Sequence, residues 1–209
     1  RGGFFMSATI LIMIGAGFGQ IKKYSEIHLR TETQLRSRER YLSLLKMATD
    51  SILNPKNSSD RYYYLITHLI NLFAADHGYF FRWDAAQEQA ILVASTLPFD
   101  QPLSDIILKP GESAITESVL QTKRTLVIDN VSNSQDIFHS TLFKNLAFPV
   151  HSILGIPLIA GEHKLGMVIL AFNSPQRFTA EEILYAEQSR QQIALALWTI
   201  QQEVDIQKR

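Results

Sequence analysis

The most informative part of the chain is residues 152–172, which read SILGIPLIAGEHKLGMVILAF. Two apolar runs, Ile153–Ile159 and Leu165–Phe172, are joined by a short polar segment around Gly161, a residue that suits a tight turn. Side chains alternate across a strand, and both alternating sets are apolar here, so both faces of each strand are predicted to be covered. The sequence therefore predicts a hairpin in the middle of a sheet.

A long helix is predicted soon after this hairpin. Thr179 can cap its first turn, Glu182 can complete a capping box, and Phe178 can pack on Ile183. No glycine or proline follows as far as Arg209, so the helix is predicted to continue to that residue.

The residues of this helix that step by three and four form an apolar seam typical of a coiled coil. We predict that Ile193, Leu197, Ile200 and Val204 face a partner helix in a homodimer. A second stripe, formed by Leu184, Ala194 and Trp198, is predicted to pack on the sheet.

Upstream of the hairpin, helical and extended patterns alternate. An amphipathic helix is predicted over Ser58–Ala75, and a short one from Pro110 to about Thr122. The predicted strands are Tyr79–Trp83, Ala90–Thr96 and Leu126–Asp129, with loops over Leu97–Leu108 and Asn130–Pro149, the second carrying an embedded helix. This order predicts an α+β fold with one central antiparallel sheet and terminal helices.

The composition excludes several classes of function. The formal net charge is zero, so nothing in the overall charge predicts binding to nucleic acid. The chain has no cysteine, which excludes disulfides, thiolate metal sites and thiol nucleophiles. No glycine-rich phosphate loop, HExxH motif or nucleophile elbow is present, so no catalytic residues and no metal site are predicted.

The N-terminal part has the pattern of a membrane anchor. Phe4–Ile21 carries no charge and would span roughly 27 Å as a helix, close to the thickness of the hydrocarbon core of a bilayer. Seven Lys/Arg against three Glu follow between Lys22 and Lys46, as expected on a cytoplasmic side. We predict a transmembrane helix over 1–21 in the inner membrane and a cytoplasmic domain after it, the alternative being a cleaved signal peptide.

Lys22–Leu53 is predicted to be a helix that links this anchor to the domain. A heptad pattern counted from Tyr24 is poor at first and improves through Tyr41, Leu45, Ala48 and Ile52. A coiled-coil linker is the interpretation, and a solvated linker helix is the alternative.

The segments Ser152–Pro157, Leu165–Leu170 and Phe178–Glu182, in this order and spacing, resemble a GAF domain. The resemblance covers about Leu42 to Trp198 and implies terminal helices on one face of the sheet and a small-molecule pocket on the other. Together with the N-terminal segments it resembles the input half of bacterial sensor histidine kinases or diguanylate cyclases. It implies domain limits of 22–41 for the juxtamembrane linker, 42–200 for the sensory domain and 201–209 for the start of a helix to an output domain.

The chain departs from several branches of this family. Covalent bilin attachment and methionine sulfoxide reduction both need cysteines, which are absent. The cyclic-nucleotide signature is matched at Asn173, Phe178 and Glu182, but Ser174 and Glu181 replace its Lys and Asp. Cyclic-nucleotide binding is therefore not supported.

A pocket is predicted from aromatic residues and from positions that border the pocket in this family, and it would take an unidentified small molecule with no cofactor predicted. Its members are Phe80, Trp83, Val127, Asp129, Phe138, His139, Phe143 and His151. Two alternatives stay open: the aromatic residues only fill the core of a ligand-free dimerisation domain, or His139 or His151 holds a haem-type cofactor. On either interpretation this part of the protein is a non-catalytic sensory or dimerisation module.

Overall fold

The computed structural model describes residue 35 and residues 37–53, 61–99, 101–108, 119–131 and 149–207. The chain divides into two compact units, Arg1–Leu42 and Ser43–Arg209, and the fold below is that of the second. The predicted transmembrane segment lies outside the described residues. Within the described residues, no helix is both long enough and apolar enough to cross a membrane.

Within the ranges that the structure describes, six strands form one sheet in the order β3-β2-β1-β6-β5-β4, with every neighbouring pair antiparallel. The predicted α+β fold is thereby confirmed. In chain order the elements are α2 (Arg61–Phe73), β1 (His77–Asp84), β2 (Gln89–Ser95), the 3-10 helix η1 (Leu103–Asp105), β3 (Ile107–Leu108), β4 (Leu126–Ile128), β5 (Ser152–Ala160), β6 (His163–Phe172) and α5 (Ala180–Gln207).

The hairpin of β5 and β6 lies inside the sheet, as its two apolar faces predict. Its register runs from Ser152 opposite Phe172 to Ala160 opposite His163, and β1 and β4 pair with its outer edges. Gly166 has a φ of +154°, and a Cβ there would lie 2.1 Å from the carbonyl oxygen of Phe81. Only glycine allows β6 to approach β1 this closely.

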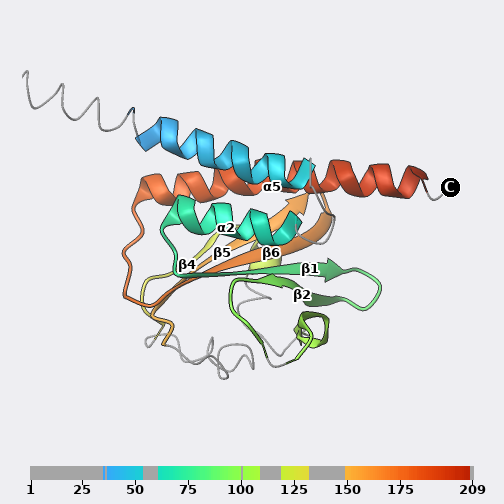
Figure 1. Ribbon diagram of the computed structural model, residues 1–209, viewed down its shortest axis with the longest axis horizontal. Helices are drawn as coiled ribbons and strands as arrows, with labels where there is room; N and C mark the ends of the chain where they lie inside the picture. Colours follow the sequence, from blue (N-terminus) through green and yellow to red (C-terminus); the bar gives the residue numbers. More distant parts are fainter. Residues whose placement is uncertain are drawn as a thin grey trace, which may run out of the picture. The chain divides into compact units, whose positions relative to one another are not determined.

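Helices α2 and α5 cover one face of this sheet (Figure 1). We call this the helix face. Tyr62 of α2 stacks on Phe80 of β1, with ring centroids 4.4 Å apart. Every second side chain of a strand points toward this face. The buried residues of α2 and of these strand positions include Leu65, Ile66, Leu69, Leu154, Ile156, Leu158, Val168 and Leu170. Leu45, Ala48 and Ile52 of the preceding helical segment are buried as well, but a coiled coil is not shown.

The opposite face of the sheet has its own apolar cluster, formed from the alternate strand positions and the segments beneath them. Its members include Tyr79, Phe81, Leu92, Ile106, Leu108, Val119, Ile128, Ile153, Met167 and Ile169. Part of the cover comes from η1 and β3, which fall in the segment Leu97–Leu108 that the sequence predicted to be only a loop. A strand of two residues is too short to show the alternating pattern from which strands are predicted.

The N-terminus of α5 has the predicted capping box. The Thr179 amide donates to the Glu182 carboxylate at 2.7 Å, and the Glu182 amide donates to Thr179 Oγ1 at 3.2 Å. Phe178 lies edge-on to Phe172 of β6, which fixes the approach of the chain to the sheet. The prediction that Leu184 packs on the sheet is wrong, since this side chain is 54% exposed.

Candidate functional site

An open cleft of about 710 Å³ lies at the end of the sheet where both hairpins turn. The N-terminus of α2, the β1–β2 turn, the β5–β6 turn and the C-terminal half of α5 form its walls. Figure 1 shows the β1–β2 turn and the C-terminal half of α5 at the same end of the domain. The lining residues used below are Arg61, Tyr62, Phe80, Arg82, Trp83, Asp84, Glu88, Glu162, His163, Lys164 and Trp198.

Each of the two tryptophans in the cleft is in contact with a residue of the β5–β6 hairpin. The imidazole of His163, at the β5–β6 turn, stacks on the indole of Trp198 in α5, with centroids 4.3 Å apart and planes inclined by 19°. Lys164 Nζ lies 5.0 Å from the ring centroid of Trp83, within the range of a cation–π interaction. The hairpin tip therefore contacts both β1 and α5 through neighbouring residues.

Two of the three carboxylates in the cleft wall have partners. Asp84 Oδ1 accepts hydrogen bonds from the amides of Ala86 and Gln87, which fixes the β1–β2 turn. Glu162 pairs with Lys123 Nζ at 2.8 Å, and this hydrogen bond lowers the pKa of Glu162.

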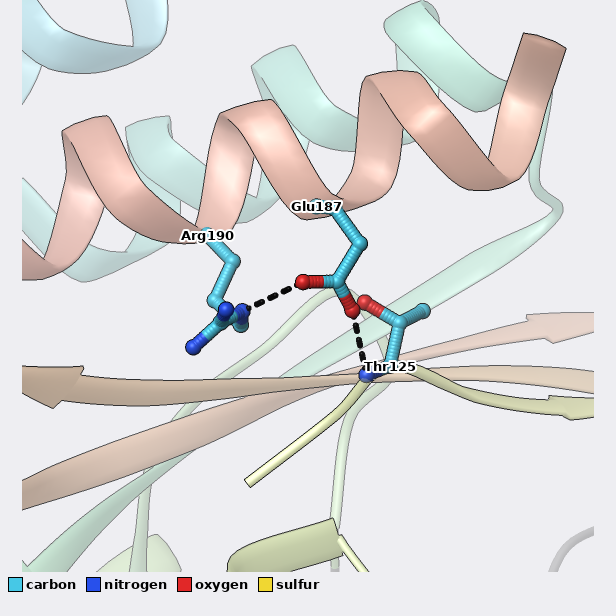
Figure 2. A network of polar contacts seen from close by, with 3 residues as sticks. All are labelled: Thr125, Glu187 and Arg190. Carbon is cyan, nitrogen blue, oxygen red and sulfur yellow. Dashed lines mark hydrogen bonds and ion pairs between the residues drawn. The ribbon is translucent and has the colours of Figure 1, made fainter. Parts of the chain in front are cut away.

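A second polar site joins the first half of α5 to the start of β4 (Figure 2). The amide of Thr125 donates to Glu187 Oε1 at 2.7 Å, and Arg190 Nε donates to Glu187 Oε2 at 2.9 Å. In Figure 2 the Glu187 side chain points from α5 toward the sheet, where Thr125 precedes the strand. One carboxylate therefore connects two elements that are 62 residues apart in sequence.

The environment of Glu187 favours its charged form. Burial alone raises the pKa of this carboxyl, but the hydrogen bond from the Thr125 amide and the charge and hydrogen bond of Arg190 outweigh burial, so the pKa lies below its ordinary value. The side chains of Arg190 and Glu187 are 18% and 30% exposed, so solvent weakens this pair only in part.

Comparison with protein families gives a match over most of this domain. The family model described as GAF domain matches residues 64–197, from α2 to the C-terminal half of α5. The chain belongs to the GAF domain family. Domains of this family are in general non-catalytic regulatory modules that act in sensing or ligand binding. A comparison with curated proteins found no match.

Solved GAF domain structures share this fold at low sequence identity. The GAF domain of a phosphoenolpyruvate-protein phosphotransferase from Coxiella burnetii has a TM-score of 0.68 and 18% identity, over 80% of this chain and 98% of that one. The GAF domain of the Acinetobacter phosphoenolpyruvate-protein phosphotransferase has a TM-score of 0.64 and 14% identity, over 79% and 97%. Residues 122 to 287 of a methyl-accepting chemotaxis protein give 0.60 and 13%, over 73% and 96%. At such low sequence identities, the structural similarity shows only that these proteins share a fold.

The predicted pocket residues of this GAF domain are dispersed. Phe80 and Trp83 both line the cleft at the end of β1. Phe80 packs on α2, whereas Trp83 packs against the apolar cluster of the opposite face. Val127 lies between Leu126 and Ile128, which both contact that cluster, so the strand period places Val127 on the helix face.

Asp129 and His151 lie beside β4 and β5, away from the cleft. Asp129 is exposed, and its carbonyl accepts a hydrogen bond from Ser152 Oγ at 2.6 Å. His151 is half-buried, and its amide donates to the Phe172 carbonyl at 2.8 Å. Phe138, His139 and Phe143 lie outside the described residues, so the predicted pocket stays a prediction. Within the described part of the chain, no group of three or more His, Cys, Asp or Glu could hold a metal ion.

The predicted dimer seam coincides in part with the core of the domain. Ile193 and Leu197 are buried, with exposures of 0% and 8%. Ile200 is half-buried and lines the cleft, and the side chain of Val204 lies outside the described residues. The dimer seam stays a prediction.

The sequence did not identify the remaining residues of the cleft. Arg82, Lys164 and Trp198 come from three separate elements, and no linear spacing connects them. One feature of the sequence could have pointed to the cleft. The chain has two tryptophans, Trp83 and Trp198, and both line the cleft.

Proposed function

We propose that this GAF domain is the non-catalytic sensory module of a membrane-tethered bacterial signal-transduction protein. The domain binds a small molecule or receives another signal, and its terminal helices relay that signal to an output domain in the same chain. The observation that carries the proposal is the position of α5, which packs on the sheet, lines the cleft and continues to Gln207, beyond the last residue of the family match. Any change in the cleft therefore acts directly on a helix that leaves the domain.

The proposed output domain is a histidine kinase or a diguanylate cyclase, on the cytoplasmic side of the inner membrane, with residues 4–21 as the anchor. In such an arrangement a ligand acts by binding two helix arrangements unequally. A coupling of roughly 1–3 kcal/mol is enough to change the output several-fold.

Pairing of two chains through their terminal helices is part of the proposal, and it also supports a second candidate function, a ligand-free dimerisation domain. Leu184 and Leu195 of α5 are 54% and 65% exposed. They lie about three turns apart and hence on one side of the helix. Exposed leucines on one helix face are typical of a surface that packs against another helix.

The test is the mass of the chain in solution, measured by light scattering. We expect a dimer for the wild type and a monomer for the double variant Leu184→Lys, Leu195→Lys, because charges in place of these two exposed leucines prevent helix packing. Gln192→Lys is the matched control, since Gln192 is also an exposed residue of α5 but lies about 80° around the helix from Leu184, and it should remain dimeric. A monomeric wild type, or a double variant that stays dimeric while folded by circular dichroism, would contradict pairing through this helix.

A further inference from the structure

We propose that the hydroxyl of Ser152 couples residues 129–131, which follow β4, to the first turn of α5. This inference rests on the proposed relay through α5, and it names a route by which a change at the sheet reaches that helix. Ser152 is the first residue of β5, and its exposed fraction is 0%. It lies at the end of the sheet opposite the cleft, because the cleft is at the turn that joins β5 to β6.

The Oγ atom of Ser152 is in contact with two segments that are distant in sequence. It donates a hydrogen bond to the carbonyl oxygen of Asp129 at 2.6 Å and accepts one from the amide of Gln176 at 2.7 Å. The carbonyl oxygen of Ser174 lies 3.3 Å away as a longer, alternative acceptor. A hydroxyl donates one proton and accepts at two lone pairs, so it can hold both segments at once. One buried oxygen atom therefore links the end of β4 to the chain that leads into α5.

Residues 129–131 are also tied to the start of β5 through the backbone. Val131 is 1% exposed, and its amide donates to the carbonyl oxygen of His151 at 2.8 Å. The amide of His151 in turn donates to the carbonyl oxygen of Phe172 at 2.8 Å, next to the pair of Ser152 and Phe172 in the sheet. A displacement of residues 129–131 therefore has to move the first residues of β5 or break these bonds.

The connection between β6 and α5 depends largely on polar contacts for its position. Its residues are exposed apart from Gln176 and Phe178, which are half-buried. Besides the bond from Gln176 to Ser152, the Asn173 amide donates to Asp76 Oδ2 at 2.7 Å. Both of these residues are exposed, so water can replace their bond, whereas loss of the buried Ser152 hydroxyl leaves the Gln176 amide without this partner. The Ser152 contact is therefore the stronger polar constraint on this connection.

The first turn of α5 follows directly after this connection. A hydrogen bond from the Ile183 amide to the Thr179 carbonyl, at 3.1 Å, closes that turn. Thr179 lies only a few residues beyond Gln176, and so short a piece of chain has little reach with which to absorb a shift. A displacement that reaches the Gln176 amide is thus passed to the start of α5.

The experiment is native-state hydrogen exchange of the whole chain, read by NMR at three amides. Gln176 and Ile183 report on the connection and on the first turn of α5, whereas the buried Ile169 of β6 reports on global unfolding. We expect Ser152→Ala to raise the exchange rate at Gln176 about three- to tenfold relative to Ile169, as the loss of one hydrogen bond allows. A smaller rise is expected at Ile183.

The coupling itself is measured with a second substitution, Asp129→Gly. It loosens the backbone on the far side of Ser152 and removes no buried side chain, since Asp129 is exposed. Asp129→Gly should raise exchange at Gln176 and Ile183 in the wild type. In the Ser152→Ala background it should cause no further rise, because the contact that transmits the change is already absent.

Ser95→Ala is the matched control for loss of a serine hydroxyl. Ser95 is also buried, and its Oγ accepts a hydrogen bond from the Leu97 amide at 3.0 Å, at the end of β2. Ser95→Ala should leave exchange at Gln176 and Ile183 unchanged relative to the core. The response of both amides to Asp129→Gly should also persist in this background.

Gln176→Pro removes the donor of the same hydrogen bond instead of its acceptor, and it keeps the test decisive if Ser152→Ala does not fold. In this variant Ile183 should exchange faster than in the wild type, relative to Ile169. Asp129→Gly should then add nothing at Ile183.

An exchange rate at Gln176 that rises no more than that of Ile169 would overturn the proposal. So would an equal response to Asp129→Gly with and without the Ser152 hydroxyl, or a Ser95→Ala variant that behaves like Ser152→Ala. These outcomes are separable from a failure of the sensory proposal, which is read from the mass of the chain and the effect of Leu184 and Leu195.

Discussion

The two halves of α5 are held to the sheet by different chemistry. In the first half, Glu187 takes an amide hydrogen bond from Thr125 and a charged one from Arg190. In the second half, Trp198 stacks on His163 of the β5–β6 turn and faces an open cleft. The first contact is partly buried and directional, whereas the second borders solvent and space that a ligand can fill. The difference indicates that the first half of α5 is held to the sheet by partly buried polar contacts and the second half by a contact at the surface.

Both halves depend on the apolar surface between these contacts, and its loss should have the largest effect. Ile193 is fully buried in the middle of α5, so Ile193→Ala should lower the free energy of unfolding by about 2–4 kcal/mol. Gln192→Ala, at an exposed position of the same helix on another side from Leu184 and Leu195, is the matched control and should change it by less than about 0.5 kcal/mol. Urea denaturation measures both. Similar effects at the two positions would contradict the packing of α5 described here.

Removing the polar contact should have a smaller effect that depends on pH. Glu187→Gln should cost about 1 kcal/mol at neutral pH, a figure reduced because the carboxylate is 30% exposed. The pKa of Glu187 is lower in the folded chain than its ordinary value of 4.5. Its contribution is therefore complete above the unfolded pKa and is lost as the pH falls through the folded pKa.

The measurement is urea denaturation of the wild type and the Glu187→Gln variant at a series of pH values from neutral to about 3. The two stability curves should converge on acidification, because the wild type loses the contribution that the variant lacks. Parallel curves would mean that Glu187 does not anchor the helix through its charge.

The aromatic contact should contribute less than the polar one. In a double-mutant cycle of His163→Ala with Trp198→Leu, the coupling free energy should be about 0.5–1 kcal/mol. The control cycle pairs His163→Ala with Trp83→Leu and should give a coupling close to zero, because Trp83 faces Lys164 instead. Coupling of equal size in both cycles would indicate a general loosening of the turn rather than a stack.

The smallest effect is expected at the ion pair beside the cleft. Lys123 and Glu162 are 47% and 88% exposed, so solvent and salt screen their attraction. Lys123→Gln should leave the urea midpoint unchanged at low and at high salt. A midpoint that falls only at low salt would show that this exposed pair holds the hairpin turn.

Much of the fold could be predicted because the strands carry their burial pattern in the sequence. The two apolar faces of β5 and β6 predict interior strands, and Thr179 with Glu182 predicts the start of α5. The apolar seam of α5 could be predicted, but the surface that it packs against could not. Residues such as Ile193 have the same spacing whether they face a sheet or a second helix.

The candidate site was harder to predict because it depends on how the elements are placed. Phe80 and Trp83 were predicted to share a pocket, but their positions three residues apart give them opposite faces, and they meet only at the end of β1. The contact between Thr125 and Glu187 requires the position of α5 along the sheet, which no local pattern fixes. Predicted residues such as His139 lie outside the described part of the chain.

The central claim is that α5 is part of the core of the domain up to about Leu197 and then continues beyond it. The most direct test is native-state hydrogen exchange of the α5 amides, measured by NMR. Amides from Ala186 to Leu197 should exchange with the same free energy as those in the buried strands β5 and β6, because they open only when the domain unfolds. Amides beyond Gln201 should exchange much faster. Rapid exchange throughout α5, with β5 and β6 still protected, would contradict this account.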